Sequence, residues 1–261
     1  MPLRAVVLLG LSALILTACG SKEPEATPAP PVTAQATQPE QGTLATAGLT
    51  INDPGPAEAL EAFIAAAAAG DTEALWALLS PVSRERLGPT AREFARKFGD
   101  GFRDGVGSFA GTPYTVVLSA RDEEGWGVAA IAGNRVRKGQ EEFAAYGAAA
   151  RLDGARWLLE LGTPIELKRV LETPEGTLGV EMAANSVIEG AGVWLDGNPL
   201  TAQVEGVKSH FVVAGRLPAA SSDDSVVVAF ARTADTAGAG AFPLRSPDER
   251  GADTGSSDIT A

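Results

Sequence analysis

The spacing of apolar residues changes once along the chain, near Gly111, and this change limits the folds that the chain can adopt. Before Gly111, apolar residues such as Leu60, Ile64 and Ala67 recur at the spacing of one helix face. After it, runs such as TPYTVVLSA and ARWLLELG read as strands joined by Glu-Gly and Asp-Gly pairs. Helices followed by an antiparallel meander predict an α+β fold.

Three helices are predicted before the strands. Gly70 ends the first helix, Asp71 is placed to cap the second, and the second ends before Pro81. Thr90 and Glu93 have the spacing of a capping box and open the third helix. A meander of this kind has one hydrophobic face, and we expect the helices to cover it because they carry the only unpaired apolar surfaces before it.

Cys19 is the only cysteine, and it follows a short apolar stretch. Residues 5–16, AVVLLGLSALIL, come after one arginine and fall short of the roughly 20 residues that cross a bilayer as a helix. With LTAC at its end, the stretch resembles the bacterial lipoprotein signal. The resemblance implies cleavage before Cys19, acylation of its thiol and its new amino terminus, and stable anchoring in a bilayer. The alternative is a secreted protein with an incidental free cysteine.

Composition divides the rest of the chain. Residues 20–52 contain few large apolar residues and many Pro, Thr and Ala, so they cannot bury enough surface to offset chain entropy. From Pro164 onward, β-rich segments recur at roughly ten-residue spacing, which is typical of a small sandwich. The predicted parts are a lipoprotein signal peptide (1–18), a disordered tether (19–52), an α+β domain (53–163), a β-sandwich (164–246) and a disordered tail (247–261).

The first ordered part, residues 57–162, resembles the nuclear transport factor 2-like superfamily, especially its exported bacterial members. The helix ending in Gly-Asp, the second helix with Trp76, and a last strand that reads Asp-Gly, then Trp157, then aliphatic residues carry this resemblance. It implies a cone, in which a curled antiparallel sheet wraps around a helix.

The second ordered part is similar to the bacterial immunoglobulin-like modules of surface proteins. The resemblance lies in AGVWLDGNPL, a strand ending in Asp-Gly, and in the later SVVVAFARTADTAGAGAF. It implies a small all-β sandwich of about 80 residues. The cysteine pair of antibody domains is missing, so apolar packing alone would hold such a sandwich together.

Charge and residue counts exclude several classes of function. The net charge of −12 becomes −13 when residues 1–18 are removed, and an acidic chain is a poor nucleic-acid partner. A single cysteine forms no internal disulfide. His210 is the only histidine and is predicted to lie on a sandwich strand in a structural or solvated role. With Cys19 acylated and only two methionines, we expect neither a metal site nor a cofactor.

Some members of the cone family are isomerases and cyclases that use a carboxylate base with hydroxyl or carboxyl donors inside the cone. By that resemblance, Tyr114, Tyr146, Asp104 and Asp122 are the residues that could be recruited. Asp122 lies in the charged turn DEEG and Asp104 lies in a glycine-rich run, so we interpret both as solvated acids. We therefore predict no catalytic residues.

Three aromatic residues are candidates for a ligand pocket. Trp126, Trp157 and Phe143 lie on the predicted strands of the first domain. In a domain of this size, large aromatic side chains usually form the core, and we predict that role here.

The sequence thus predicts a lipid-anchored, extracytoplasmic lipoprotein of the bacterial cell membrane, or of the outer membrane in an organism that has one. Its expected role is non-catalytic binding or spacing, with the bilayer as one partner through Cys19 and another envelope protein or polymer as a second. The alternative is a cone-family enzyme or carrier that acts on a small apolar molecule.

The anchor is testable by Cys19→Ser. Without the thiol, the precursor should escape lipoprotein processing, and the protein should be released or misplaced. Detergent partitioning of both forms measures this. If mutant and wild type both enter the aqueous phase, the lipoprotein interpretation is wrong.

Overall fold

The computed structural model describes residues 48–137, 139–172, 177–200, 202–207, 210–216 and 224–244. Cys19, most of the expected tether and the whole of the expected tail lie outside these residues. Within them, no helix has the length and apolar character needed to cross a membrane.

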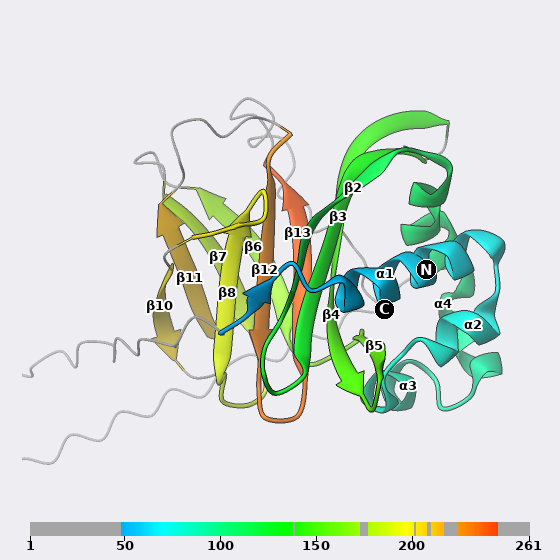
Figure 1. The fold of residues 1–261 in the computed structure, drawn as a ribbon, viewed down its shortest axis with the longest axis horizontal. Coiled ribbons are helices and arrows are strands. Elements are labelled where there is room, and N and C mark those ends of the chain that lie inside the picture. Colours follow the sequence, from blue (N-terminus) through cyan, green and yellow to red (C-terminus); the bar gives the residue numbers. More distant parts are fainter. Residues whose placement is uncertain are drawn as a thin grey trace, which may run out of the picture. The chain divides into compact units, whose positions relative to one another are not determined.

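The order of elements confirms an α+β fold with antiparallel sheets (Figure 1). The helices are α1 (Pro54–Ala69), α2 (Thr72–Ala77), α3 (Pro81–Leu87), α4 (Ala91–Asp104) and the 3-10 helix η1 (Val106–Gly111). The first strands are β1 (Thr50–Ile51), β2 (Tyr114–Arg121), β3 (Trp126–Arg137), β4 (Gln140–Asp153) and β5 (Arg156–Glu160). The later strands are β6 (Glu166–Glu172), β7 (Thr177–Ala183), β8 (Gly190–Leu195), β9 (Asn198–Pro199), β10 (Ala202–Val207), β11 (His210–Arg216), β12 (Val226–Arg232) and β13 (Ala237–Pro243).

The predicted helix boundaries hold, but the helix α3 and the 3-10 helix η1 were missed. Gly70 ends α1 with φ 68°, the Asp71 side chain accepts from Ala74 N at 2.9 Å, and the Thr90 hydroxyl accepts from Glu93 N at 3.3 Å. The prediction of three helices is wrong because α3 begins where a break was expected.

The pair Ser80-Pro81 follows the end of α2 and also begins α3. The Ser80 side chain accepts from Ser83 N at 3.1 Å, and Pro81 fills the first turn of α3. Proline ends a preceding helix and is equally well suited to open the next, because its missing N–H needs no partner there. The sequence pattern alone did not distinguish these two roles.

Strands β1 to β5 form one antiparallel sheet in the order β1-β2-β3-β4-β5. Each predicted strand of the meander is present, and the register of the long β3–β4 hairpin pairs Ile131 with Tyr146. The two residues of β1 come from the end of the expected tether and pair with Ala120 and Arg121 of β2.

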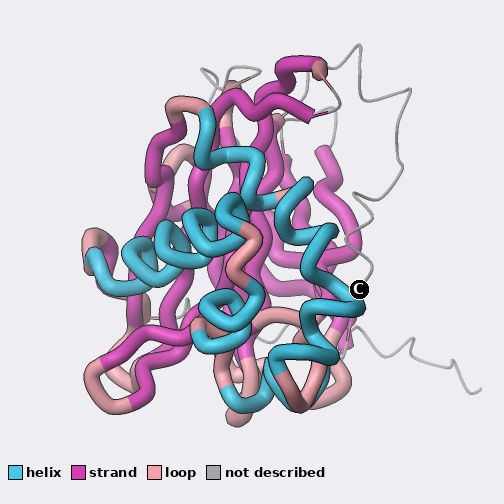
Figure 2. Tube along the Cα trace, turned by 90° about the vertical axis from the view of Figure 1, so that its right-hand side faces the viewer, coloured by secondary structure: helices cyan, strands magenta, loops and turns pink. Residues whose placement is uncertain are grey.

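The helices cover one face of this sheet (Figure 2). Figure 2 shows α1 to α4 lying in front of the strands. Their shared core contains fully buried side chains from both layers, among them Phe63, Phe94 and Phe109 from the helices and Ile131 and Leu159 from the sheet.

Two more antiparallel sheets follow, in the orders β10-β11-β7-β6 and β13-β12-β8-β9. They share a core that includes Val180, Met182, Val193 and Val227. The segments predicted as β6, β7, β8, β11, β12 and β13 are strands, whereas the sequence interpretation missed the short β9 and the strand β10.

The first sheet is buried on both faces, contrary to the single hydrophobic face that we expected. Along β3, Ala129 and Ile131 belong to the core beneath the helices. Val128 and Ala130 belong to a separate core with Phe230 of β12. The sequence hid this second face because alanine fills much of it, and alanine buries less apolar area than the larger aliphatic residues that mark the buried face of a strand.

This second core weakens one expectation. The predicted α+β domain of residues 53–163, with helices covering the one hydrophobic face of its sheet, would be expected to fold alone. Such a fragment would expose Trp126, Val128 and Leu118, which are buried against the sandwich in the whole chain. An apolar face of this kind favours association or unfolding when it is left uncovered.

Strands β4 and β13 approach each other closely within this second core. A Cβ atom at Gly147 of β4 would lie 2.8 Å from the backbone carbon of Gly240 and 2.9 Å from the backbone nitrogen of Ala241, both in β13. Real side chains do not approach backbone atoms so closely, so glycine is needed at this position.

Gly147→Ala should therefore push the two sheets apart and lower the free energy of unfolding by about 1–3 kcal/mol. The matched control is Gly101→Ala in α4, where an added Cβ meets no atom within 4 Å. Gly101→Ala should raise the free energy of unfolding by about 0.5–1 kcal/mol, because alanine favours a helix more than glycine does. Denaturant unfolding of both variants measures this, and equal effects of the two changes would contradict the close approach.

Candidate functional site

The space between the helices and the first sheet is filled by aromatic side chains. The ring centroids of Phe63 and Phe102 lie 5.2 Å apart in an edge-to-face pair, and those of Phe94 and Phe102 lie 5.6 Å apart in a stack. Phe109 meets the edge of Tyr114 at 6.4 Å. Contacts at these distances are those of a packed core rather than of an open pocket.

The structure does not bring together the four residues that the cone-family resemblance offered for catalysis. Tyr114 and Tyr146 pack against the core beneath the helices. Asp104, whose side chain is 72% exposed, lies at the end of α4 beside Arg103. Asp122 is in the β2–β3 turn, where its carboxylate pairs with Arg232 of β12 rather than with that core.

Both tyrosine hydroxyls have a pKa above the ordinary value, so they ionise less readily. Burial raises the pKa of the Tyr146 hydroxyl far above its ordinary value. Burial and the nearby Glu61 carboxylate raise the pKa of Tyr114. Two neutral phenols therefore line this part of the core, and neither can serve as a base near neutral pH.

The three aromatic candidates for a ligand pocket do not share one site: Trp126 is buried in one core, whereas Phe143 and Trp157 are partly buried and pack against two different cores. Trp126 and Phe143 pack between the first sheet and the sandwich. Trp157 packs beneath the helices, where its ring lies against Gly55 and Gly127. A Cβ atom at Gly127 would lie 2.8 Å from the Trp157 ring, so this glycine makes room for the indole.

Asp122 is buried, so the interpretation of it as a solvated acid is wrong. Its residue exposure is 8%, and its Oδ1 accepts from Glu124 N at 2.9 Å and from Trp126 N at 2.8 Å. Its Oδ2 lies 3.3 Å from Nε of Arg232, which comes from β12 of the sandwich. A turn pattern indicates local solvent access only, whereas a distant strand covers this turn.

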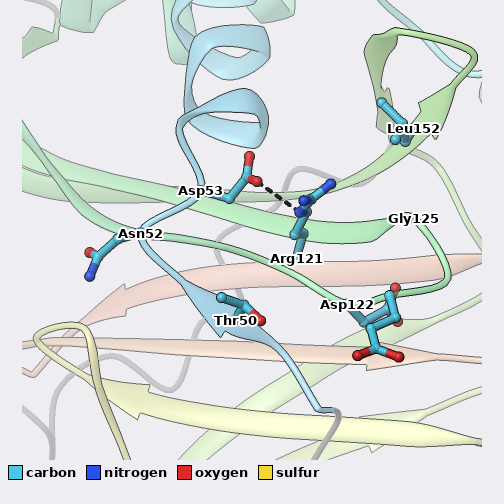
Figure 3. A pocket seen from close by; sticks show the side chains of 8 residues that line it. Thr50, Asn52, Asp53, Arg121, Asp122, Gly125 and Leu152 are labelled. Carbon is cyan, nitrogen blue, oxygen red and sulfur yellow. Dashed lines mark ion pairs between the residues drawn. The ribbon is translucent and has the colours of Figure 1, made fainter.

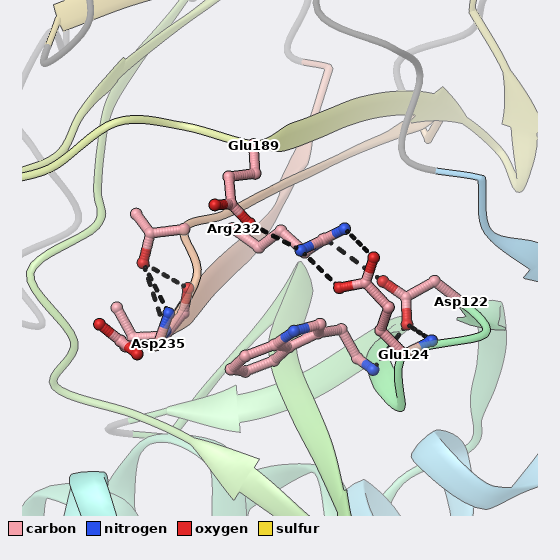
Figure 4. Close-up of polar contacts among 8 residues, drawn as sticks. Asp122, Glu124, Glu189, Arg232 and Asp235 are labelled. Carbon is pink, nitrogen blue, oxygen red and sulfur yellow. Dashed lines mark hydrogen bonds and ion pairs between the residues drawn. The ribbon is translucent and has the colours of Figure 1, made fainter.

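Arg232 holds three carboxylates at the boundary of the two parts (Figure 4). Besides Asp122, its Nη1 lies 3.0 Å from Glu124 and 3.3 Å from Glu189, and its side chain is only 12% exposed. The guanidinium thus ties the β2–β3 turn to β12 and to the residue before β8. On the same face, the Arg151 guanidinium lies 4.5 Å above the Trp126 ring.

Glu160 is a second buried acid, at the end of β5. Thr236 Oγ1 in the β12–β13 turn donates to Glu160 Oε2 at 3.4 Å, and Oε1 has no hydrogen-bond partner. Burial raises the pKa of the Glu160 carboxyl, and the Ser80 hydroxyl, Arg151, Thr236 and Arg86 offset part of that shift.

Two clefts lie outside the core beneath the helices. The first, of about 460 Å³, is lined by residues of β1, the start of α1 and the β2–β3 turn (Figure 3). Asp53 and Arg121 form an ion pair of 2.8 Å across it, and Asp122, which also lines it, pairs with Arg232. The second, also about 460 Å³, lies between β2 and the β8–β9 turn and is lined by residues such as Val116, Val117 and Pro199.

Among the described residues, no three His, Cys, Asp or Glu side chains are placed to hold a metal ion. His210 is the first residue of β11, as the sequence predicted for a strand position. Cys19 cannot be placed, because it lies outside the described residues.

No protein-family model matches this chain, and neither a curated protein nor a solved structure matches it. The chemistry of its own residues is therefore the basis for any function assigned to it.

The Arg232 cluster makes the next prediction, a double-mutant cycle of Asp122→Asn and Arg232→Ala. Asparagine keeps the oxygen that accepts from the backbone, so the cycle isolates the charge pair. Because this pair is nearly buried, its coupling should be about 2 kcal/mol. The more exposed pair Arg135–Glu142, at 2.7 Å, is the control and should give about 0.2–1 kcal/mol. Coupling no larger than the control would show that the cluster does not join the two parts.

Proposed function

We propose that the protein is a lipid-anchored, extracytoplasmic module of a bacterial cell envelope that binds or spaces other components and has no catalytic activity. In this proposal, acylated Cys19 holds it to the membrane, and the partner is another envelope protein or polymer. The first domain is of the nuclear transport factor 2-like type and the second is an immunoglobulin-like sandwich. The lipoprotein-like residues 1–19 support the anchor.

One observation carries the non-catalytic part of the proposal. An enzyme of the cone type needs a cavity with an acid or base that faces it. Here phenylalanine side chains fill that space, with Phe63, Phe94 and Phe109 fully buried. The buried acids Asp122 and Glu160 instead contact residues of the sandwich.

The shared core supports a spacing role. A spacer transmits position only if its parts do not move freely against each other. The first sheet and β12 and β13 bury a common set of side chains, and Arg232 adds an ionic contact at the edge of that core. Neighbouring domains with small polar interfaces move freely by comparison.

The fold-family part of the proposal has coarser support. Four helices lie against a sheet whose strands β2 to β5 form a meander, as a cone of this type requires. The two later sheets enclose a core without any cysteine, as an immunoglobulin-like module stabilised by apolar packing requires.

The second candidate function is a cone-family enzyme or carrier for a small apolar molecule. It is favoured by one observation, the two tyrosines that lie on the helix side of the sheet. Protonated Tyr114 and Tyr146 hydroxyls could donate hydrogen bonds to a ligand oxygen, as in isomerases of that family.

Trp157→Ala separates the two candidates. If the space beneath the helices is a filled core, the free energy of unfolding of the variant should fall by about 3–5 kcal/mol, and its Tm should fall strongly. The value should lie toward the low end, because the Trp157 ring is only partly buried. Trp157→Phe, which keeps most of the ring, is the matched control and should melt closer to wild type.

Tryptophan fluorescence of the wild type completes this test. Titration with a panel of apolar small molecules should give no saturable response if the core is filled. A stable Trp157→Ala variant together with a saturable wild-type response would favour the carrier or enzyme instead.

A further inference from the structure

One buried carboxyl, that of Glu160, lies where β5 meets the β12–β13 turn. Glu160 of β5 lies opposite Ala149 of the neighbouring strand β4. Ala149 belongs to the core between the first sheet and the sandwich. Glu160 is 2% exposed. Its hydrogen bond from the Thr236 hydroxyl therefore joins two parts of the chain that are 76 residues apart.

The turn that supplies this hydroxyl is itself well ordered. Thr233 N donates to Thr236 O at 2.8 Å, and Thr236 N donates to Thr233 Oγ1 at 3.3 Å. Both threonines are buried. The turn thus presents the Thr236 hydroxyl in a fixed position against the end of β5.

No cation is committed to Glu160 among the residues that the structure describes. Arg151 of β4 is exposed and stacks on the Trp126 ring at 4.5 Å, and Arg86 of α3 is exposed. The turn's own acid, Asp235, is also exposed. Neither arginine forms an ion pair with the Glu160 carboxyl, whose Oε1 is left without a partner.

The Ser80 hydroxyl is a further polar neighbour, which lowers the pKa of Glu160 and so offsets part of the effect of burial. The hydroxyl of Ser80, at the start of α3, donates to Ser83 Oγ at 3.1 Å. Ser83 Oγ also accepts from Leu161 N at 2.8 Å. A buried carboxylate with so few donors is costly, because ionised groups need hydration or several hydrogen bonds.

We propose that Glu160 makes this contact a proton-dependent joint between the helix–sheet domain and the sandwich. The joint is closed while the carboxyl carries its proton and loosens when it ionises, because water must then enter between β5 and the turn. This inference goes beyond the proposed function, since it holds whatever the protein binds.

The direction of the pH effect follows from the burial of the carboxyl. The closed joint holds the Glu160 proton more tightly than the open one, so its pKa is raised when the joint is closed. The joint is therefore closed most firmly below the ordinary pKa of a glutamate. Closure is lost as the pH rises through the raised pKa that Glu160 has in the closed joint. A single proton changes the closing equilibrium by at most about tenfold per pH unit.

Hydrogen exchange of the full chain tests the joint. Backbone amides of residues 233–237 should exchange faster as the pH rises from about 4 to about 8, after correction for the intrinsic rate. Glu160→Gln cannot ionise and should abolish this pH dependence. Glu141→Gln, at an exposed position of the β3–β4 hairpin, is the matched control and should behave as wild type.

A second variant decides the question if Glu160→Gln does not fold. Thr236→Val removes a hydrogen bond that favours the ionised carboxyl, so the midpoint of the pH dependence should move upward. An unchanged or lowered midpoint would overturn the proposal. So would a pH dependence in Glu160→Gln that equals the wild-type one.

Discussion

The first sheet of this protein is covered on both faces, and the rest of the structure depends on the second covering. Its strands alternate their side chains between a core beneath the helices and a core against β12 and β13. Small residues allow this double burial, since Gly147 lies so close to Gly240 that no Cβ would fit. The two predicted domains thus share a core, and each contributes one wall of it.

Polar groups lie at the ends of that shared core and differ in how they are compensated. Asp122 Oδ1 accepts from two backbone N–H groups, and its Oδ2 forms an ion pair with Arg232 that lacks hydrogen-bond geometry. Glu160 has one long hydrogen bond from Thr236 and no ion pair with any residue that the structure describes. A buried charge is tolerated when hydrogen bonds and ion pairs satisfy it. A buried charge without enough such partners weakens the interface in which it lies.

This arrangement limits where a partner could bind. Both faces of the first sheet are occupied, and aromatic side chains fill the space beneath the helices. The clefts described above lie on the outer surface, and the ion pair of Asp53 and Arg121 already crosses one of them. Recognition through an outer surface therefore agrees better with the structure than enclosure of a ligand, which is why a binding or spacing role is proposed.

Local physics made much of the fold readable from the sequence, whereas long-range packing decided the site. Helix ends such as Gly70 and Thr90 were predictable because capping involves neighbouring residues, and the strands because alternation has a period of two. The start of α3 at Pro81 was not, since proline serves equally at a stop and a start. The burial of Asp122 and Glu160 depends on Arg232 and Thr236, residues 110 and 76 positions away. No local pattern encodes such a contact, because only the docking of one sheet on another brings these side chains together.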